Sequence, residues 1–128
     1  MDLNQLAEKL FDSKTQEETT AIMENIEAER ANLKSEADLN LIGQQWEKEG
    51  KTEEAAVLYE INLLNNFDGA FPYDRLAIIY RKQKNKDDEI RVLEKAVYVF
   101  ENIVSKERPD RNNKLEKYKK DLEKAKSK

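Results

Sequence analysis

The sequence predicts an all-α protein of about seven helices arranged as antiparallel pairs. Three observations lead to this fold class. The 128 residues include three glycines and two prolines, too few to build the turns of an all-β protein. Apolar residues recur at helical spacing, and their pattern repeats at a fixed interval along the chain. Charged residues make up 39% and apolar residues 38% of the chain, which excludes both a membrane-embedded and a disordered protein.

Helix boundaries follow from capping and turn residues. Ser35 and Asp38 form a capping-box pattern at one helix start, and Gly50 ends the same helix. Asp87 and Asp88 place negative charge where the dipole of a later helix favours it. The expected helices cover about residues 3–10, 16–31, 36–49, 52–66, 70–84, 87–105 and 109–125.

The last two helices need a separate argument. The run from Ala96 to Phe100 is β-branched and aromatic and locally favours a strand. The apolar residues around it nevertheless share one side of a helical wheel, which predicts a heavily buried helix covered on its outer side by the last helix. Pro109 suits the first turn of that last helix. Its apolar stripe consists of Leu115, Tyr118, Leu122 and Ala125.

An internal repeat is visible when the sequence is shifted so that Leu39 falls on Tyr73. The same shift aligns residues of similar character, in the pairs Leu39/Tyr73, Ile42/Leu76, Gly43/Ala77, Trp46/Tyr80, Lys48/Lys82, Ala56/Ile90, Tyr59/Leu93 and Leu63/Val97. The small pair, Gly43 and Ala77, has a physical explanation, because two helices approach closely only where neither carries a large side chain. We therefore expect Trp46 and Tyr80 in the core rather than in a ligand cage.

In period, helix pairing and residue classes, the chain resembles the tetratricopeptide repeat family, whose 34-residue helix–turn–helix unit carries large, apolar, small and aromatic residues on its first helix. The first unit matches with Leu39, Ile42, Gly43, Trp46, Gly50, Ala55 and Tyr59, and the second with Tyr73, Leu76, Ala77, Tyr80, Leu93 and Ala96. The departures are Asn62 and Glu89 in place of alanine, Lys84 in place of glycine and Phe67 in place of proline.

The resemblance implies one domain, a right-handed α-solenoid of stacked helix pairs. Its expected parts are a degenerate N-terminal pair (1–34), two repeats (35–69 and 70–105) and a C-terminal capping helix (106–128). In such solenoids the first helices line a concave face that takes an extended or helical peptide. The expected peptide-binding residues are Asn40, Leu41, Gln44, Arg75, Ile78, Arg81 and Lys82.

The chemistry of this face fits an acidic or amphipathic peptide. Arginine and lysine donate to carboxylates, and Asn40 and Gln44 can hydrogen-bond a peptide backbone. Leu41 and Ile78 are apolar among polar neighbours, and two interpretations stay open for them: contact with a ligand, or burial against another element of the fold.

Catalysis is not expected, because the chain contains neither cysteine nor histidine and no glycine-rich phosphate loop. The alternative is a carboxylate-dependent active site or a metal site, formed for instance by Asp87, Asp88 and Glu89. Adjacent acids at a helix start more often complement the helix dipole, and they point in different directions. We expect no catalytic residue, metal ligand or cofactor.

The favoured function is therefore a cytoplasmic adaptor that binds a protein or peptide. Residues 106–128 carry a net charge of +5 and the first 105 residues −9, but no long block of like charge predicts binding to nucleic acid or a membrane. No signal peptide or spanning segment is recognisable. The alternative function is a self-associating structural module. It would form a homodimer through an outer side of the helix near residues 87–105, at Val92 and Val99, or through an open end of the stack.

Overall fold

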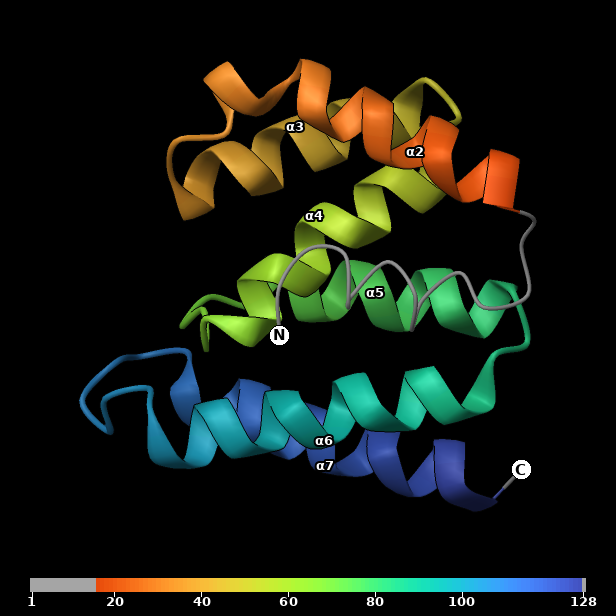
Figure 1. The fold of residues 1–128 in the computed structure, drawn as a ribbon. Helices are drawn as coiled ribbons and strands as arrows, with labels where there is room; N and C mark the ends of the chain where they lie inside the picture. The colour runs from red at the N-terminus through yellow and green to blue at the C-terminus, as the bar shows by residue number, and fades with distance from the viewer. Residues whose placement is uncertain (1–15, 128) are drawn as a thin grey trace. The chain divides into compact units, whose positions relative to one another are not determined.

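The computed structural model describes residues 16–127, which form α-helices, one short 3-10 helix and no strand. The elements are α2 (Gln16–Ala28), η1 (Arg30–Asn32), α3 (Glu36–Lys48), α4 (Thr52–Leu64), α5 (Phe71–Lys82), α6 (Lys86–Asn102) and α7 (Arg111–Ser127) (Figure 1). The all-α prediction is confirmed, and the strand-like run 96–100 is helical within α6. The helix expected near residues 3–10 lies outside the described residues.

The described chain divides between Leu64 and Asn65 into two compact units. In the first unit, α3 and α4 form a helical hairpin and α2 packs against α4 (Figure 1). The N-terminus of α3 is capped as predicted, because the Ser35 hydroxyl oxygen accepts a hydrogen bond of 3.1 Å from the Asp38 N–H. Helix α4 is buried along most of its length, at Glu54, Ala55, Ala56, Val57, Leu58, Tyr59, Glu60, Asn62 and Leu63.

The second unit consists of α5, α6 and α7. Helices α5 and α6 form a second hairpin, and α7 packs along α6 (Figure 1). The cap of α6 is the Asn85 side chain, which accepts from the Asp88 N–H at 3.2 Å. The core of this unit includes Tyr73, Leu76, Leu93, Ala96, Phe100, Leu115 and Tyr118.

The two hairpins are built to the same local plan. Trp46 on α3 and Tyr80 on α5 are both in the core, as predicted, with 5% and 4% of their surface exposed. Each first helix ends with a residue in the left-handed region, Gly50 at φ 82° and Lys84 at φ 57°. The N–H of the next residue then bonds the carbonyl of the buried aromatic residue, from Lys51 to Trp46 at 2.8 Å and from Asn85 to Tyr80 at 2.9 Å. Both hydrogen bonds belong to the same type of helix-ending motif, which occurs at equivalent positions of the two hairpins.

Two sequence predictions about the second unit are wrong in detail. Pro109 does not lie in the first turn of α7, which begins at Arg111, but in the turn that precedes it. Val92 and Val99 do not form an apolar outer side of α6, since neither exposes any surface. Helix α6 has α5 and α7 packed against it, so it buries more of its circumference than a helix covered by one neighbour.

None of the helices among the described residues is long and apolar enough to cross a membrane.

Candidate functional site

The residues predicted to bind a peptide fall on two helices, one in each unit. Asn40, Leu41 and Gln44 lie on α3, whereas Arg75, Ile78, Arg81 and Lys82 lie on α5. The two sets are therefore two local surfaces, the α3 face and the α5 face, each with its own geometry.

On the α3 face, Leu41 is the conspicuous residue. Its side chain is 65% exposed, although Leu39 and Trp46 on the same helix are buried. Gln44, one turn further on, is also exposed. Asn40 is half-buried, and its side-chain oxygen accepts a hydrogen bond of 2.9 Å from the Asn62 amide on α4. Asn40 therefore serves the hairpin itself, whereas Leu41 and Gln44 face outward.

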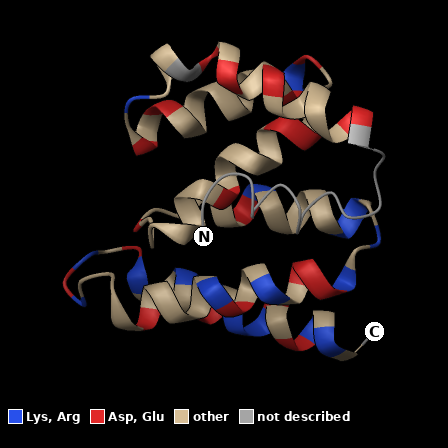
Figure 2. Cartoon of the chain, viewed as in Figure 1, with Lys and Arg blue, Asp and Glu red and all other residues tan. Residues whose placement is uncertain are grey.

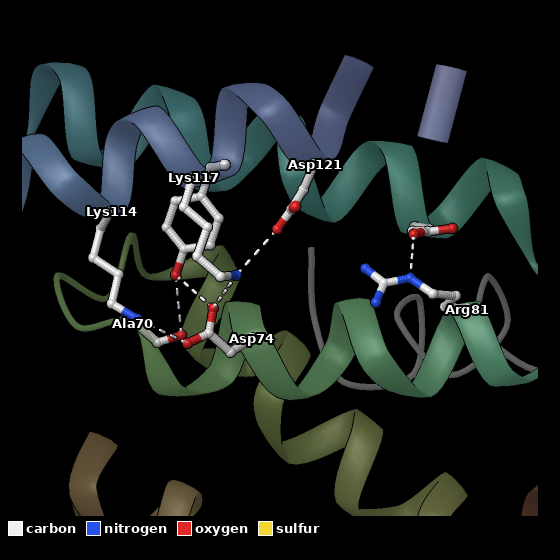
Figure 3. Close-up of polar contacts among 8 residues, drawn as sticks. Ala70, Asp74, Arg81, Lys114, Lys117 and Asp121 are labelled. Carbon is white, nitrogen blue, oxygen red and sulfur yellow. Dashed lines mark hydrogen bonds and ion pairs between the residues drawn. The ribbon is translucent and has the colours of Figure 1, made fainter. Parts of the chain in front are cut away.

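On the α5 face, Arg81 is held by a carboxylate of its own hairpin. Its Nε donates to Oε2 of Glu89 on α6 at 2.9 Å; the Arg81 side chain is 47% exposed and that of Glu89 only 8%. The two terminal nitrogens of Arg81 extend away from that carboxylate (Figure 3). The buried Glu89 carboxylate thus holds one nitrogen of a half-exposed guanidinium, and the two terminal nitrogens are not bonded to it.

The other predicted residues of the α5 face differ in exposure. Lys82 is exposed, whereas Arg75 and Ile78 are half-buried. Of the two apolar residues for which the sequence left the environment open, Leu41 is therefore mostly exposed and Ile78 is partly covered.

Asp74, at the N-terminal end of the same helix α5, is a centre of contacts that the sequence did not predict. Its carboxylate accepts a hydrogen bond of 2.9 Å from the Tyr118 hydroxyl group on α7. Lys114 and Lys117 of α7 lie 3.4 and 3.7 Å from the same carboxylate (Figure 3). One acidic side chain of α5 therefore binds three polar side chains of α7.

Tyr118 is fully buried, and its ring packs against two other aromatic rings. Its centroid lies 6.4 Å from that of Tyr73 on α5 and 5.3 Å from that of Phe100 on α6. Burial first, and then the negative charge of Asp74, raise the pKa of the Tyr118 hydroxyl group far above its usual value. Tyr118 is therefore a neutral hydrogen-bond donor at physiological pH. The sequence placed it in the apolar stripe of the last helix, but its polar partner is 44 residues away and no local pattern reveals such a contact.

Two departures from the repeat pattern prove to be polar links between paired helices. Glu89 stands where Ala55 stands in the first hairpin, and it binds Arg81. Asn62 stands where Ala96 stands in the second hairpin, and its amide donates to the Glu36 carbonyl oxygen at 3.1 Å as well as to Asn40. The Glu89 carboxylate and the Asn62 amide nitrogen thus each have a partner on the first helix of their own hairpin, which offsets part of the cost of burying them, whereas Oδ1 of Asn62 is buried without a hydrogen-bond partner.

The acidic run at the start of α6 is divided among separate partners. Asp88 accepts from Arg91 at 3.0 Å and from the Asn85 amide at 2.7 Å, while Glu89 is directed to Arg81. Across residues 16–127, no cluster of three or more carboxylates has a geometry that could hold a metal ion.

Charge is unevenly distributed along the sequence. Lysine and arginine are frequent on α7, which carries Arg111 and six lysines against three acidic residues (Figure 2). Helix α2, in the other unit, contains four glutamates and no lysine or arginine.

Comparison with models of protein families, with curated proteins and with solved structures found no match to this chain. The features that bear on function are the α3 face and the α5 face and the chemistry of their side chains.

Proposed function

We propose that the protein is a non-catalytic interaction module, an adaptor that binds an acidic or amphipathic peptide segment, with the α5 face as the main contact. The observation that carries this proposal is the geometry of Arg81. Its Nε is held by the buried Glu89 carboxylate, its side chain is 47% exposed, and its two terminal nitrogens extend away from that carboxylate (Figure 3).

A guanidinium held in this way is suited to recognising a carboxylate. Arginine pairs with a carboxylate through two parallel N–H donors, and this geometry is most effective when the side chain is already oriented. Glu89 supplies that orientation and so reduces the conformational entropy that binding would otherwise cost. Lys82 and Arg75 add positive charge to the same helix, and Ile78 offers a partly exposed apolar contact.

The α3 face supports a peptide partner independently. Leu41 is a large apolar side chain exposed in the middle of a helix, next to the exposed amide Gln44. An amphipathic segment offers an apolar side chain to Leu41 and a backbone or side-chain polar group to Gln44. No cofactor or nucleic acid enters this proposal, and the partner is a protein or peptide.

We further propose that the two hairpins are consecutive units of a tetratricopeptide-like, right-handed solenoid. The support is the recurrence of the helix-ending hydrogen bond and of the left-handed residue at equivalent positions of the two hairpins. In this architecture α7 is the capping helix, because its outward residues are strongly polar.

Nuclear magnetic resonance with two matched peptides tests the binding proposal. The probes are a 15-residue amphipathic peptide in which leucine and glutamate alternate at helical spacing, and the same peptide with lysine in place of glutamate. We expect the acidic probe to shift the amide signals of α5 around Arg81 in a saturable way. The lysine probe should leave them unchanged.

Variants separate binding from folding. Arg81→Lys keeps the charge but loses the paired donors, and we expect about tenfold weaker binding with little change in melting temperature. Glu89→Gln keeps Arg81 but loosens its orientation, so it should weaken binding less. Reversal of charge in Arg75→Glu/Arg81→Glu should abolish binding. Undiminished binding by the folded double variant, or shifts that avoid α5, would rule out this face.

A further inference from the structure

Helix α7 is held in place by few apolar side chains. Within its 17 residues, Leu115, Tyr118 and Ala125 are buried, and most of the others are charged or amide residues. The 13-residue helix α4, in contrast, has nine buried residues. Docking of α7 therefore combines a small number of buried side chains with specific polar contacts to α5 and α6.

Those contacts define a helix-binding groove on α5 and α6, which we call the α7 groove. Its floor contains the rings of Tyr73 and Phe100, which pack against Tyr118. One side carries Asp74, which binds Lys114, Lys117 and Tyr118 (Figure 3).

The end of α6 completes the groove. The Phe100 and Glu101 carbonyl oxygens accept from Nε and Nη2 of Arg111 at 2.8 and 3.1 Å. Because these carbonyls belong to the last turn of α6, they favour a cationic partner at this point. The Glu101 carboxylate lies 3.6 Å from the ammonium group of Lys119.

These contacts define which kind of helix the α7 groove binds. It takes an amphipathic helix with an arginine in its first turn, a tyrosine seven residues later and lysines that flank this tyrosine. Every copy of the chain carries such a helix in its own α7, so the partner with the best fit to this groove is a second copy.

The segment that joins α6 to α7 is short and polar. Residues 103–110 contain one buried side chain, Val104, and their hydrogen bonds include the local ones from Ser105 to Glu107 and from Arg108 to Asp110 at 2.7 Å. These contacts within the segment persist wherever the following helix docks. Arg108 also lies 3.8 Å from the Asp68 carboxylate and 5.5 Å from the centroid of the Phe100 ring, and these two contacts hold the segment to its own copy.

We infer that the α7 groove is a self-recognition site, at which two copies exchange their α7 helices to form a symmetric dimer. Each α7 then makes in the other copy the contacts it makes in its own. This interaction is separate from the peptide binding proposed above, since it uses Asp74 and the rings of Tyr73 and Phe100 rather than Arg81 and Lys82.

A simple estimate gives the concentration at which exchange occurs. A helix tethered by a short link competes at an effective concentration of the order of 1 mM. Because the contacts are the same in both forms, the wild-type dimer should have a dissociation constant of about that size. Any change that weakens docking within one copy but not between copies lowers this value.

Charge reversal provides such a change. One chain carries Asp74→Lys in its groove, and the other carries Lys114→Glu/Lys117→Glu on its helix. Each chain alone has a mismatched groove and helix, whereas exchange between the two chains restores both pairings. If each restored pairing increases the equilibrium constant for docking of α7 by roughly 30-fold, two restored pairings lower the dissociation constant of the heterodimer from about 1 mM to about 1 µM. The triple variant Asp74→Lys/Lys114→Glu/Lys117→Glu is matched within one chain and should stay monomeric at that concentration.

The test is sedimentation velocity at about 50 µM with each chain alone, the equimolar mixture and the triple variant. We expect dimer only in the mixture. In mixtures of isotope-labelled and unlabelled chains, nuclear Overhauser contacts between Tyr118 of one copy and Phe100 of the other should identify the exchanged form. If a single variant is unfolded, mixing should restore its helical circular dichroism.

A mixture that remains monomeric, or that stays unfolded while the triple variant folds, would overturn the inference. A dimer without contacts from Tyr118 to Phe100 of the other copy would overturn it as well. Wild-type chain at about 1 mM gives a test that needs no substitution. Labelled and unlabelled chains mixed, warmed and cooled should show the same contacts between copies, and their absence would also reject the proposal.

Discussion

The hairpins α3–α4 and α5–α6 follow the same plan with different side chains. In the first, Gly43 lies against Tyr59, and a Cβ atom at Gly43 would be 2.6 Å from Cε1 of that ring. In the second, the equivalent positions carry Ala77 and Leu93, both buried. A larger residue on the first helix therefore goes with a smaller one on the second. At this pair of positions the two hairpins fill a similar combined volume with different residues.

The polar links between paired helices also start at equivalent positions of the first helices but use different side chains. Position 47 on α3 carries Glu47, which accepts a hydrogen bond of 2.5 Å from the Tyr59 hydroxyl group, whereas the equivalent position on α5 carries Arg81, which donates to Glu89. Both residues connect the last turn of a first helix to the helix that follows. The sign of the charge is reversed between hairpins, and each has a partner of the appropriate kind.

The largest change in stability is expected at Gly43, where the first hairpin has no room for a side chain between its two helices. Gly43→Ala places a methyl group against the fully buried Tyr59 ring, so we expect the free energy of unfolding to fall by about 2–3 kcal/mol. Urea denaturation followed by fluorescence of Trp46, the single tryptophan of the chain, reports this change. The matched control is Ala77→Gly in the second hairpin, which should cost about 1 kcal/mol through helix propensity. Equal losses at the two positions would contradict the difference in packing.

A smaller effect is expected at the contact between α5 and α7, which has no counterpart in the first hairpin. Tyr118→Phe removes the hydrogen bond to Asp74 and should cost about 1.5 kcal/mol at neutral pH. Because the folded protein keeps the Tyr118 proton while an unfolded tyrosine loses it near pH 10, this stabilisation is present below pH 10 and declines above it.

The variant isolates this pH dependence. Between pH 10 and 11, the wild-type protein should lose up to about 1.4 kcal/mol more stability than Tyr118→Phe, measured by urea denaturation at each pH. Parallel losses in the two proteins would show that Tyr118 ionises as readily in the folded chain as in the unfolded one.

The smallest change in stability is expected at the turns, where the first hairpin has Gly50 and the second has Lys84. Both residues have a positive φ, which a side chain disfavours. We expect Lys84→Gly to raise the free energy of unfolding by about 0.5 kcal/mol and Gly50→Lys to lower it by about 1 kcal/mol. Thermal denaturation followed by circular dichroism measures both, and a loss of stability in Lys84→Gly would show that Lys84 has a role beyond the turn.

Much of this fold could be predicted from the sequence, because helix periodicity and caps are local signals. Ser35, Gly50 and the stripe that contains Trp46 and Tyr80 were sufficient to place α3 and α5. The departures Asn62 and Glu89 weakened the repeat in sequence, although in the structure each one links the two helices of its hairpin.

Contacts made by α7 were less predictable. The position of Pro109 suggested a helix start two residues too early, because proline also fits the turn that precedes a helix. Val92 and Val99 were assigned to an open surface, since a helical wheel does not show how many neighbours pack around the helix. The role of Asp74 as the acceptor for Tyr118 depends on a contact between segments 44 residues apart, which no local sequence pattern reveals.

The central claim is that the hairpins share one volume divided differently between their paired helices. A double-mutant cycle at Gly43 and Tyr59 tests it most directly, with Gly43→Ala, Tyr59→Leu and the double variant that gives the first hairpin the residue pair of the second. We predict that the double variant is more stable than Gly43→Ala alone by at least about 1 kcal/mol, because the smaller leucine makes room for the new methyl group. Losses that add to within about 0.5 kcal/mol would contradict the claim, because they would mean that the two positions do not share space.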